Sequence, residues 1–519
     1  MAAIVPDSVI QFFNDVGLSP TYEDTRYFAS TSAKDSFFDN LPKAQVISCT
    51  YQRENRGRVR VQLPMSTLYN KQYMRFKNTA FENKWFYAFI TAVDYVNNVT
   101  TEVAYQIDYI MTWMGSFTLG QCFIERQHST TDAIGDNIIE ENLEIGDYVY
   151  NQIQRTGYLQ NTYQIIIGAS VDQNGDDVAG GQLINNIYSG IVLHNFGTVA
   201  AANQFIDQLT GKAKSDALVG AVMMPSGFAP TEGGGTSAAK LITIDKNIYN
   251  LDYYTPRNKK LFTYPYNFLV VTNGDGNFAT FRYEFFKTGA AIGVNKCAFY
   301  LYGQPDLQPE FILEPIQYKT DATSNFATSE KMSLKGFPQC AFNIDQYKAF
   351  LAQNSSSLAA DAISTVGSGA INTLVNLGTG NIGGAISAAV STGEAIARRE
   401  AKLNDYAKKP TQANGSTTGS IEAGRGLKDF YFYKQTITGQ YARRIDQYFD
   451  MFGYAQNNVA TPNMHARPSW TYVKTIGCVV HCSAPAEDVR EIEAAFDRGI
   501  RFWDSSVTIG NYSANNQVS

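Results

Sequence analysis

The stretch Lys84–Met111, KWFYAFITAVDYVNNVTTEVAYQIDYIM, indicates the fold class of this chain. Its first part, Lys84 to Val96, is rich in aromatic and β-branched residues, and apolar and polar residues alternate from Val99 to Met111. A period of two is typical of a strand with one buried face. Asn97 and Asn98 separate the two runs and tolerate the positive φ of a tight turn. We therefore expect a long antiparallel hairpin.

Further strands are expected on both sides of this hairpin. Ala44 to Arg53 and Arg58 to Pro64 predict a second hairpin, joined at Glu54 to Gly57, so that the first 125 residues would form a small β-barrel or sandwich. Other apolar, β-branched runs predict strands at Tyr163 to Ala169, Phe268 to Thr272, Phe278 to Phe286, Lys296 to Tyr302 and Trp470 to Cys482. The chain is predicted to be mainly β, with α+β elements.

Helices are expected at fewer places. Val199 to Leu209 predicts one helix in the middle of the chain. Near the C-terminus, Tyr441, Ile445, Tyr448, Phe449 and Phe452 recur at the spacing of one helix face, and Gly453 marks its end. Ala484 to Arg498 predicts a second helix, with Val489, Ile492 and Phe496 pointing inward and Gly499 after its end. With the strand from Trp470 between them, these helices predict an α-β-α unit.

The composition favours a protein with large subunit interfaces. Charged residues make up 17% of the 519 positions, below the typical ~25%, whereas Tyr and Phe number 32 each. The net charge of −6 gives no basic surface for neutralising phosphates, although an acidic wall could let DNA slide past. The six cysteines are scattered, so we expect reduced thiols in a protein made in the cytoplasm.

The segment Ala362–Gly393, AISTVGSGAINTLVNLGTGNIGGAISAAVSTG, contains no charged or aromatic side chain over 32 residues. It is too apolar for an ordinary surface loop, yet its seven glycines and three asparagines make it too polar for a committed membrane helix. As a helix it would measure about 48 Å, more than the ~30 Å of a bilayer core. We expect a segment that is hidden first and exposed later, held between helices at Asp345–Ala360 and Glu394–Lys408. A flexible linker or a buried core hairpin is the alternative interpretation.

Candidate chemical motifs are weak. None of the four histidines, His128, His194, His465 and His481, has a partner at the spacing of a metal pair or of a general base with an orienting group. Cys478 and Cys482 would share one face of a strand while His481 points to the other, which favours two buried structural cysteines. Asp172 to Asp177 lacks the glycine and glutamate of a calcium loop and predicts a polar turn. We therefore expect no enzyme activity, metal or cofactor.

Several motifs together resemble the tail knob (distal tube) proteins of small short-tailed phages related to phi-29. The resemblance rests on Asn83–Phe89, Ile107–Asp108, Thr112–Met114, Phe123–Ile124 with His128, Thr25–Phe28, Tyr264–Tyr266, the helix Tyr441–Tyr454 with Arg443–Arg444, Phe496–Asp497, Gly499–Ile500, Trp503 and Ile509–Ser513. Each motif is weak alone, but they occur in the same order along most of the chain. The residues carried over as structural motif positions are Trp85, Phe86, Tyr87, Trp113, Arg443, Arg444, Trp503 and Tyr512.

The resemblance implies a tail-tip protein of the virion that forms a hexameric ring from tail-tube-like or hub-like β-barrel domains. Viral double-stranded DNA would leave through its lumen without sequence-specific binding. An apolar loop from each subunit would plug the lumen and later enter the host cell membrane, which assists genome ejection. Other tail proteins at the collar and the tip would be further partners. By position, the counterpart of that loop is Ala362–Gly393, here richer in Thr and Asn and shorter than the family pattern.

The resemblance and the patterns together predict a domain division. We expect a tube-type β domain at 1–125, a mixed α/β domain at 126–260, and a second tube-type domain with the α-β-α unit at 261–344 and 427–519. Residues 345–410 would carry the helices and the membrane-active loop at 362–393, and residues 411–426 a polar linker. The loop residues expected to act on the membrane are Ala362, Ile363, Val366, Gly369, Ile371, Leu374, Val375, Leu377, Gly380, Ile382, Gly383, Gly384, Ile386, Ala389 and Val390.

Two other protein classes fit parts of the sequence. A pore-forming toxin would share the uncharged insertion, but it should carry a signal peptide, which the opening MAAIVPDSVIQFF does not resemble, and strict alternation in the inserted part. A virion-associated wall-degrading enzyme would need a convergent pair of carboxylates, and no pair among the 48 acidic residues is indicated by spacing.

Overall fold

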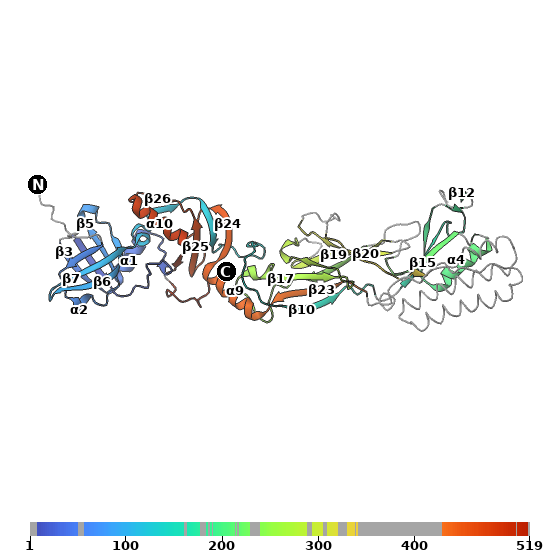
Figure 1. Cartoon of the computed structure of the whole chain (residues 1–519), viewed down its shortest axis with the longest axis horizontal. Helices are drawn as coiled ribbons and strands as arrows, with labels where there is room; N and C mark the ends of the chain where they lie inside the picture. The colour runs from blue at the N-terminus through green and yellow to red at the C-terminus, as the bar shows by residue number, and fades with distance from the viewer. Residues whose placement is uncertain are drawn as a thin grey trace. The chain divides into compact units, whose positions relative to one another are not determined.

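The computed structural model describes residues 8–49, 57–159, 163–176, 183–184, 187–188, 190–212, 214, 217–228, 239–287, 293–304, 309–319, 330–337, 339–340, 428–504 and 506–516. The chain divides into two compact units. Unit 1 consists of residues 1–147, 253–266 and 437–519, and unit 2 of residues 148–252 and 267–436. Figure 1 shows the elements of both, coloured along the chain. The expected helices beside the apolar segment, the segment itself and the polar linker lie outside the described residues.

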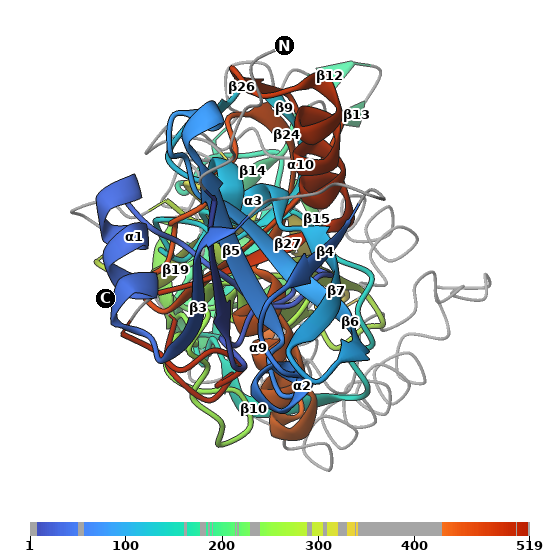
Figure 2. The same ribbon diagram turned by 90° about the vertical axis from the view of Figure 1, so that its left-hand side faces the viewer.

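The N-terminal part of unit 1 is a six-stranded antiparallel sheet in the order β3-β1-β5-β6-β7-β4. Figure 2 shows β5, β6 and β7 side by side within it. The strands are β1 Ser8–Phe13, β3 Lys43–Cys49, β4 Arg58–Val61, β5 Tyr73–Asn78, β6 Phe86–Asn97 and β7 Thr100–Ile107. The helices around them are α1 Thr31–Asn40, α2 Met65–Leu68, α3 Tyr109–Trp113 and the 3-10 turn η1 Thr79–Phe81.

The hairpin predicted from Lys84–Met111 is confirmed in its pairing, since β6 and β7 are antiparallel and turn at Asn97–Asn98. Its second strand ends earlier than expected, at Ile107. The carboxylate of Asp108 accepts a hydrogen bond from the backbone N–H of Met111 at 2.9 Å and begins α3. A side chain that binds an N–H group three residues ahead favours a helical turn over the strand ladder.

The second hairpin is wrong in its pairing. Its strands exist as β3 and β4, but β3 pairs with β1 and β4 pairs with β7. Strand pairing is decided by which buried faces match, and here the N-terminal strand supplies Ile10 and Phe12, both fully buried, between β3 and β5. Proximity in the sequence therefore misled the prediction.

A five-stranded sheet, β2-β27-β25-β9-β24, forms the second part of unit 1. Its strands are β2 Thr25–Arg26, β9 Cys122–Gln127, β24 Tyr454–Ala460, β25 Trp470–Ile476 and β27 Ile500–Trp503, and only the β2–β27 pair is parallel. A separate antiparallel pair is formed by β8 Phe117–Leu119, which precedes β9 in the sequence, and β26 Val480–Cys482, which follows β25. The strand predicted over Trp470–Cys482 is thus two strands, separated at Gly477, whose φ of 67° interrupts an extended backbone.

Both predicted C-terminal helices are confirmed as α9 Gly439–Phe452 and α10 Ala486–Arg498. Ile492 and Phe496 of α10 are fully buried in an aromatic cluster with Phe38 of α1 and Tyr87 of β6. Phe38 and Tyr87 lie 4.7 Å apart between ring centroids. The C-terminal helix therefore packs on residues from the beginning of the chain.

A further short turn, η3 Lys259–Phe262, belongs to the segment of unit 1 that returns from unit 2.

The described residues of unit 2 form three four-stranded sheets and a small hairpin. One sheet has β10 Tyr148–Arg155, β23 Tyr431–Ile437, β17 Asn267–Thr272 and β18 Phe278–Phe281, and another has β16 Lys240–Asp245, β19 Lys296–Gln304, β20 Glu310–Ile316 and β21 Met332–Leu334. The third has β14 Val192–Phe196, β11 Tyr163–Ala169, β15 Leu218–Pro225 and β22 Gln339–Cys340, with α4 Val199–Gly211. The hairpin is β12 Leu183–Ile184 with β13 Ile187–Tyr188.

Unit 2 is held together by apolar contacts between its sheets. Phe299 of β19 lies 5.2 Å from Phe281 of β18 and 5.2 Å from Phe432 of β23, so the first two sheets share one core. The predicted strand at Phe278 ends at Phe281, because the chain turns into the 3-10 turn η4 Tyr283–Phe285. The predicted strand at Tyr163 and the predicted helix at Val199 are both confirmed, and α4 packs against β11 and β15. The described residues are thus mainly β, as expected.

Asp108 precedes α3 in unit 1, and its ionisation allows the stability of that unit to be tested by pH. It is fully buried, and the hydroxyl of Tyr73 donates to its Oδ2 at 2.9 Å. Burial raises the pKa of Asp108 to about 6, above its value in an unfolded chain. As the pH rises from about 4 to about 6, the unfolded carboxyl ionises while the folded one does not, so the folded state loses stability on the order of 2–3 kcal/mol.

Asp108→Asn retains an acceptor oxygen but cannot ionise. We expect its stability relative to the parent chain to be greater at pH 7 than at pH 4, by roughly 2 kcal/mol. Denaturant unfolding of both proteins over this pH range measures the difference. The same difference at pH 4 and pH 7 would contradict the assignment.

Candidate functional site

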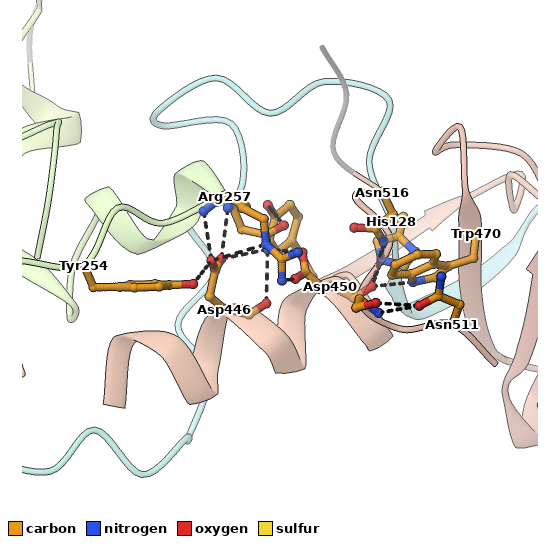
Figure 3. A network of polar contacts seen from close by, with 11 residues as sticks. His128, Tyr254, Arg257, Asp446, Asp450, Trp470, Asn511 and Asn516 are labelled. Carbon is orange, nitrogen blue, oxygen red and sulfur yellow. Dashed lines mark hydrogen bonds and ion pairs between the residues drawn. The ribbon is translucent and has the colours of Figure 1, made fainter. Parts of the chain in front are cut away.

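The site with the most organised polar chemistry lies along one face of α9. Asp446 and Asp450 stand four residues apart, so their side chains leave the same side of the helix. Both are buried, beside the apolar residues Ile445 and Phe449. Figure 3 shows the two carboxylates and their partners. A carboxylate without water must receive hydrogen bonds from the protein, which fixes the position of whatever supplies them.

Asp446 is held by the segment that returns from unit 2. Its Oδ2 accepts from the Tyr254 hydroxyl at 2.7 Å and from the backbone N–H of Arg257 at 2.8 Å. Its Oδ1 accepts from the backbone N–H of Asn258 at 3.0 Å and from the Asn258 side-chain amide at 2.8 Å. Four donors therefore surround one carboxylate, and two of them are backbone groups of consecutive residues.

Asp450 connects the same segment to the five-stranded sheet. Its Oδ1 accepts from the amide of Asn258 at 2.8 Å, and its Oδ2 forms an ion pair with Arg257. Its backbone carbonyl accepts from the indole N–H of Trp470 at 2.7 Å and from the amide of Asn516 at 2.7 Å. The final turn of α9 is thereby fixed to β25 and to the C-terminal residues.

His128 joins this network as a neutral side chain. Burial lowers the pKa of His128 well below its ordinary value. Its Nδ1 accepts from the backbone N–H of Tyr472 at 2.8 Å, so the proton resides on Nε2, which lies 2.9 Å from the carbonyl oxygen of Asp450. His128 follows β9 directly and fixes that strand to α9 and β25 by hydrogen bonds.

A second ionic cluster lies beside Tyr454. The Tyr454 hydroxyl is 2.6 Å from Oδ1 of Asp132 and 2.9 Å from Oδ1 of Asn258. Glu141 forms ion pairs with Lys260 and with Arg126. Burial, followed by the charge of Arg126, lowers the pKa of Lys260 to about 7. The same three chain segments meet here as at the α9 carboxylates.

The geometry suits a structural junction. Both carboxylates of α9 are occupied by protein donors, and His128 is hydrogen-bonded through both ring nitrogens. Within the part of the chain that the structure describes, no group of three or more His, Cys, Asp or Glu side chains is arranged to hold a metal ion. The network instead ties residues 126–141, 254–260 and 446–516 into one unit.

A family model described as the C-terminal domain of the tail knob protein gp9 of Bacillus phage phi29 matches residues 228–517. The chain belongs to this phage tail knob family. A second model, for the N-terminus of the caudoviral major tail protein, matches residues 6–118. Because this family forms part of the phage tail, the chain is a tail protein of the virion.

Similar proteins match over nearly the whole chain. The tail knob proteins gp9 of Bacillus phages PZA and B103 are 24% and 25% identical to it, with 98% of each chain covered in both comparisons. The structure of the tail knob protein gp12 of bacteriophage C1 superimposes with a TM-score of 0.62, covering 99% of both chains at 15% identity. The last comparison shows that the fold is shared.

In this tail knob family member, the motif residues carried over by resemblance lie in several places. Trp503 is buried against Trp470 at 5.1 Å, Tyr512 lies 5.3 Å from Trp503, and the indole of Trp113 donates to Asp488 at 2.9 Å. Tyr87 is buried in the aromatic cluster, Phe86 stacks on Phe76 at 5.6 Å, and the Arg75 guanidinium lies 4.1 Å from the Trp85 ring centroid.

Arg443 and Arg444 are exposed on α9, over the rings of Tyr254 and Tyr441 respectively. The structure brings Arg443 to the edge of the α9 network, whereas Trp85, Tyr87 and Trp113 belong to one hydrophobic cluster. All predicted residues of the membrane-active loop lie outside the described residues, so their role stays a prediction.

Sequence reasoning missed Asp446, Asp450, Arg257 and Asn258. One signal was available, because the two aspartates directly follow Ile445 and Phe449, which the helical pattern places in the core. Charged residues at the border of a buried helix face are rarely buried unless paired. The partners at Tyr254–Asn258 carried no comparable signal, since they stand in an irregular segment far away in the sequence.

Removing the Asp446 carboxylate should destabilise unit 1 strongly. Asp446→Ala leaves the donors of Arg257 and Asn258 buried and unpaired, and we expect a loss of about 3–5 kcal/mol. Gln447→Ala, an exposed change on the next residue of α9, is the matched control and should stay within about 0.5 kcal/mol of the parent. Thermal and denaturant unfolding of both variants measures the effect, and similar values for the two would contradict the role of Asp446.

Gly453 provides an independent test of the contact between α9 and β9. Its φ is 64°, and a Cβ there would overlap backbone atoms of Gln127 and His128. Gly477 has a similar φ of 67° but open space around its Cβ position. We expect Gly453→Ala to cost more than about 3 kcal/mol and Gly477→Ala only about 1 kcal/mol, measured by chemical unfolding. Equal costs would show that backbone conformation alone accounts for both.

Proposed function

We propose that this tail knob protein forms a ring at the tip of the phage tail, through which DNA leaves the virion, and that Ala362–Gly393 acts on the host membrane. The observation that carries the proposal is membership of the tail knob family along nearly the whole chain, combined with a long uncharged segment inside it. A hexameric ring, as the resemblance implies, would place six such segments around one lumen.

The insertion point of the segment supports its independence from the folded cores. Before it, β22 pairs with β15, and after it, β23 pairs with β17. The nearest described strands before and after the segment in the sequence therefore both pair with strands that precede it in the chain. Closing a longer loop adds little entropic cost, about 0.6 kcal/mol for each doubling of length, so the cores can tolerate a large insertion here.

Exposed apolar surface supports contact between subunits. One face of the β10-β23-β17-β18 sheet carries a groove of about 470 Å³, lined by residues that include Tyr150, Phe268, Phe278 and Tyr433. The exposed fractions of Tyr150 and Phe278 are 60% and 74%. Exposed aromatic side chains of this kind are typical of a surface that a neighbouring copy covers.

The energetics of the loop fit a switch between two environments. At about 25 cal/mol per Å², burial of a few hundred Å² of Ile, Leu and Val surface per subunit would hold the plug closed by several kcal/mol. A membrane offers competing apolar surroundings, and a small preference per loop is multiplied over the ring. Among the described residues, no helix is long and apolar enough to cross a membrane.

Deleting Ala362–Gly393 tests the proposal. We expect the shortened chain to fold and to form rings in electron micrographs, because the strands before and after the segment pair with earlier strands, while dye leakage from liposomes is lost. A deletion product that stays monomeric or unfolds would show that the segment belongs to the core. Rings that still permeabilise liposomes would show that another part of the chain acts on the membrane.

Substitutions within the segment separate its apolar character from its length. Ile382→Asp together with Ile386→Asp should leave ring formation unchanged and reduce leakage at least tenfold, because two charges oppose entry into hydrocarbon at roughly 3 kcal/mol each. Ile382→Leu with Ile386→Leu is the matched control and should leak normally. Normal leakage from the aspartate variant would remove this segment from the mechanism.

A further inference from the structure

Two turns of unit 2 contain the same dipeptide, an asparagine followed by a glycine, in different surroundings. One is Asn174–Gly175, after β11, and the other is Asn273–Gly274, between β17 and β18. A third such pair, Asn414–Gly415, lies outside the described residues. This dipeptide is chemically labile, because glycine has no Cβ to hinder attack of its backbone nitrogen on the asparagine side chain. Whether the attack occurs depends on how the fold holds each asparagine.

The two turns are built in the same way. In each, Oδ1 of the first residue accepts hydrogen bonds from the backbone N–H groups two and four residues later. Asp172 accepts them at 2.8 and 2.7 Å in the first turn, and Asn273 accepts them at 2.9 and 3.3 Å in the second. A side chain in this first position is bound to the backbone of its own turn. The asparagine of the labile pair holds that position only in the second turn.

Asn273 is protected by burial and by hydrogen bonds. Its exposed fraction is 2%, and its Nδ2 donates to the backbone carbonyl of Ser333 in β21 at 2.8 Å. With the two bonds that its Oδ1 accepts, three hydrogen bonds must break before its Cγ can meet the nitrogen of Gly274. At about 1 kcal/mol each, these bonds slow the reaction roughly a hundredfold.

Asn174 is the third residue of its turn, and its side chain is exposed. Its backbone is fixed through the N–H, which donates to Asp172, and through the carbonyl, which accepts from Nε2 of Gln208 in α4 at 2.9 Å. Among the described residues, no hydrogen bond holds its side-chain amide. Gly175 donates its N–H to the Asp172 carbonyl at 3.0 Å and lies under the flexible side chain of Lys212. Loss of one hydrogen bond and motion of one side chain therefore free the attacking nitrogen.

We propose that Asn174 is a site of spontaneous deamidation. The backbone nitrogen of Gly175 attacks Cγ of Asn174 and forms a new C–N bond, while the bond from Cγ to the side-chain nitrogen breaks. The proton of the glycine N–H leaves with that nitrogen as ammonia, and a succinimide ring remains. Water then opens the ring at one of its two carbonyl carbons. Opening at Cγ gives aspartate, and opening at the main-chain carbonyl gives isoaspartate.

Either product changes the turn. Both add a carboxylate at position 174, two residues from Asp172 and from Asp176, which already forms an ion pair with Lys212 at 2.9 Å. In isoaspartate the main chain runs through the former side chain, so the carbonyl that accepts from Gln208 becomes a free carboxylate. The contact between the turn and α4 is therefore altered as the protein ages. A stored preparation would contain more than one form of unit 2.

The test follows the purified full-length chain during incubation at mildly alkaline pH, with peptide maps taken at intervals. In the native protein, we expect the Asn174 peptide to convert to its aspartate and isoaspartate forms at least about tenfold faster than the Asn273 peptide, because hydrogen bonds hold the latter side chain. In denaturant the two peptides should convert at similar rates, because the dipeptide is the same. The Asn414 peptide is followed separately.

Asn174→Gln is the matched control, because glutamine keeps the amide but must close a larger ring, which forms more slowly. This variant should show no conversion at position 174, while the rate at Asn273 stays unchanged. Equal native rates at Asn174 and Asn273 would overturn the proposal. An Asn174 that stays intact in the native chain but converts in denaturant would overturn it as well. The two peptides are compared within the parent chain, so the result does not depend on folding of the variant.

Discussion

The burial of two carboxylates on α9 is the constraint on which unit 1 depends. Removing a charged group from water costs several kcal/mol unless the protein replaces the lost hydrogen bonds. For Asp446 the replacement comes from Tyr254, Arg257 and Asn258, and two of the donors are backbone N–H groups. The chain must therefore return from unit 2 to this helix. Residues 253–266 are short, yet unit 1 cannot satisfy α9 without them.

This constraint also explains how a protein can carry so much inserted sequence. Residues 148–252 and 267–436 interrupt unit 1 in the sequence, and its polar network fixes Tyr254 after the first interruption and α9 after the second. Within unit 2, β22 and β23, the nearest described strands before and after the apolar segment in the sequence, both pair with earlier strands. Loops closed on rigid elements can lengthen at small entropic cost.

Local patterns predicted those elements whose signal lies within one stretch of sequence. The β6–β7 hairpin, α4, α9 and α10 all showed their own periodicity, and each lies where it was expected. Predictions that depended on partners far away were less successful, since β3 pairs with β1 rather than with β4. Asp108 ended one strand through the hydrogen bond of its side chain and Gly477 another through its positive φ, and alternation of apolar residues reports neither. The network around Asp446 was missed because its donors come from an irregular segment.

The use of charge in this chain connects the fold to the proposed ring. Only 17% of the residues are charged, and several of them are buried within the cores, including Arg75, Asp108, Lys260, Asp446 and Arg467. Charges used inside are not available to keep the outer surface hydrophilic. Aromatic side chains such as Tyr150, Tyr253 and Phe278 are exposed instead, at 60%, 99% and 74%. A free monomer with such a surface would tend to associate. In the proposed ring, the same exchange would supply apolar contact area at the subunit boundaries while the buried ions fix the geometry of each subunit.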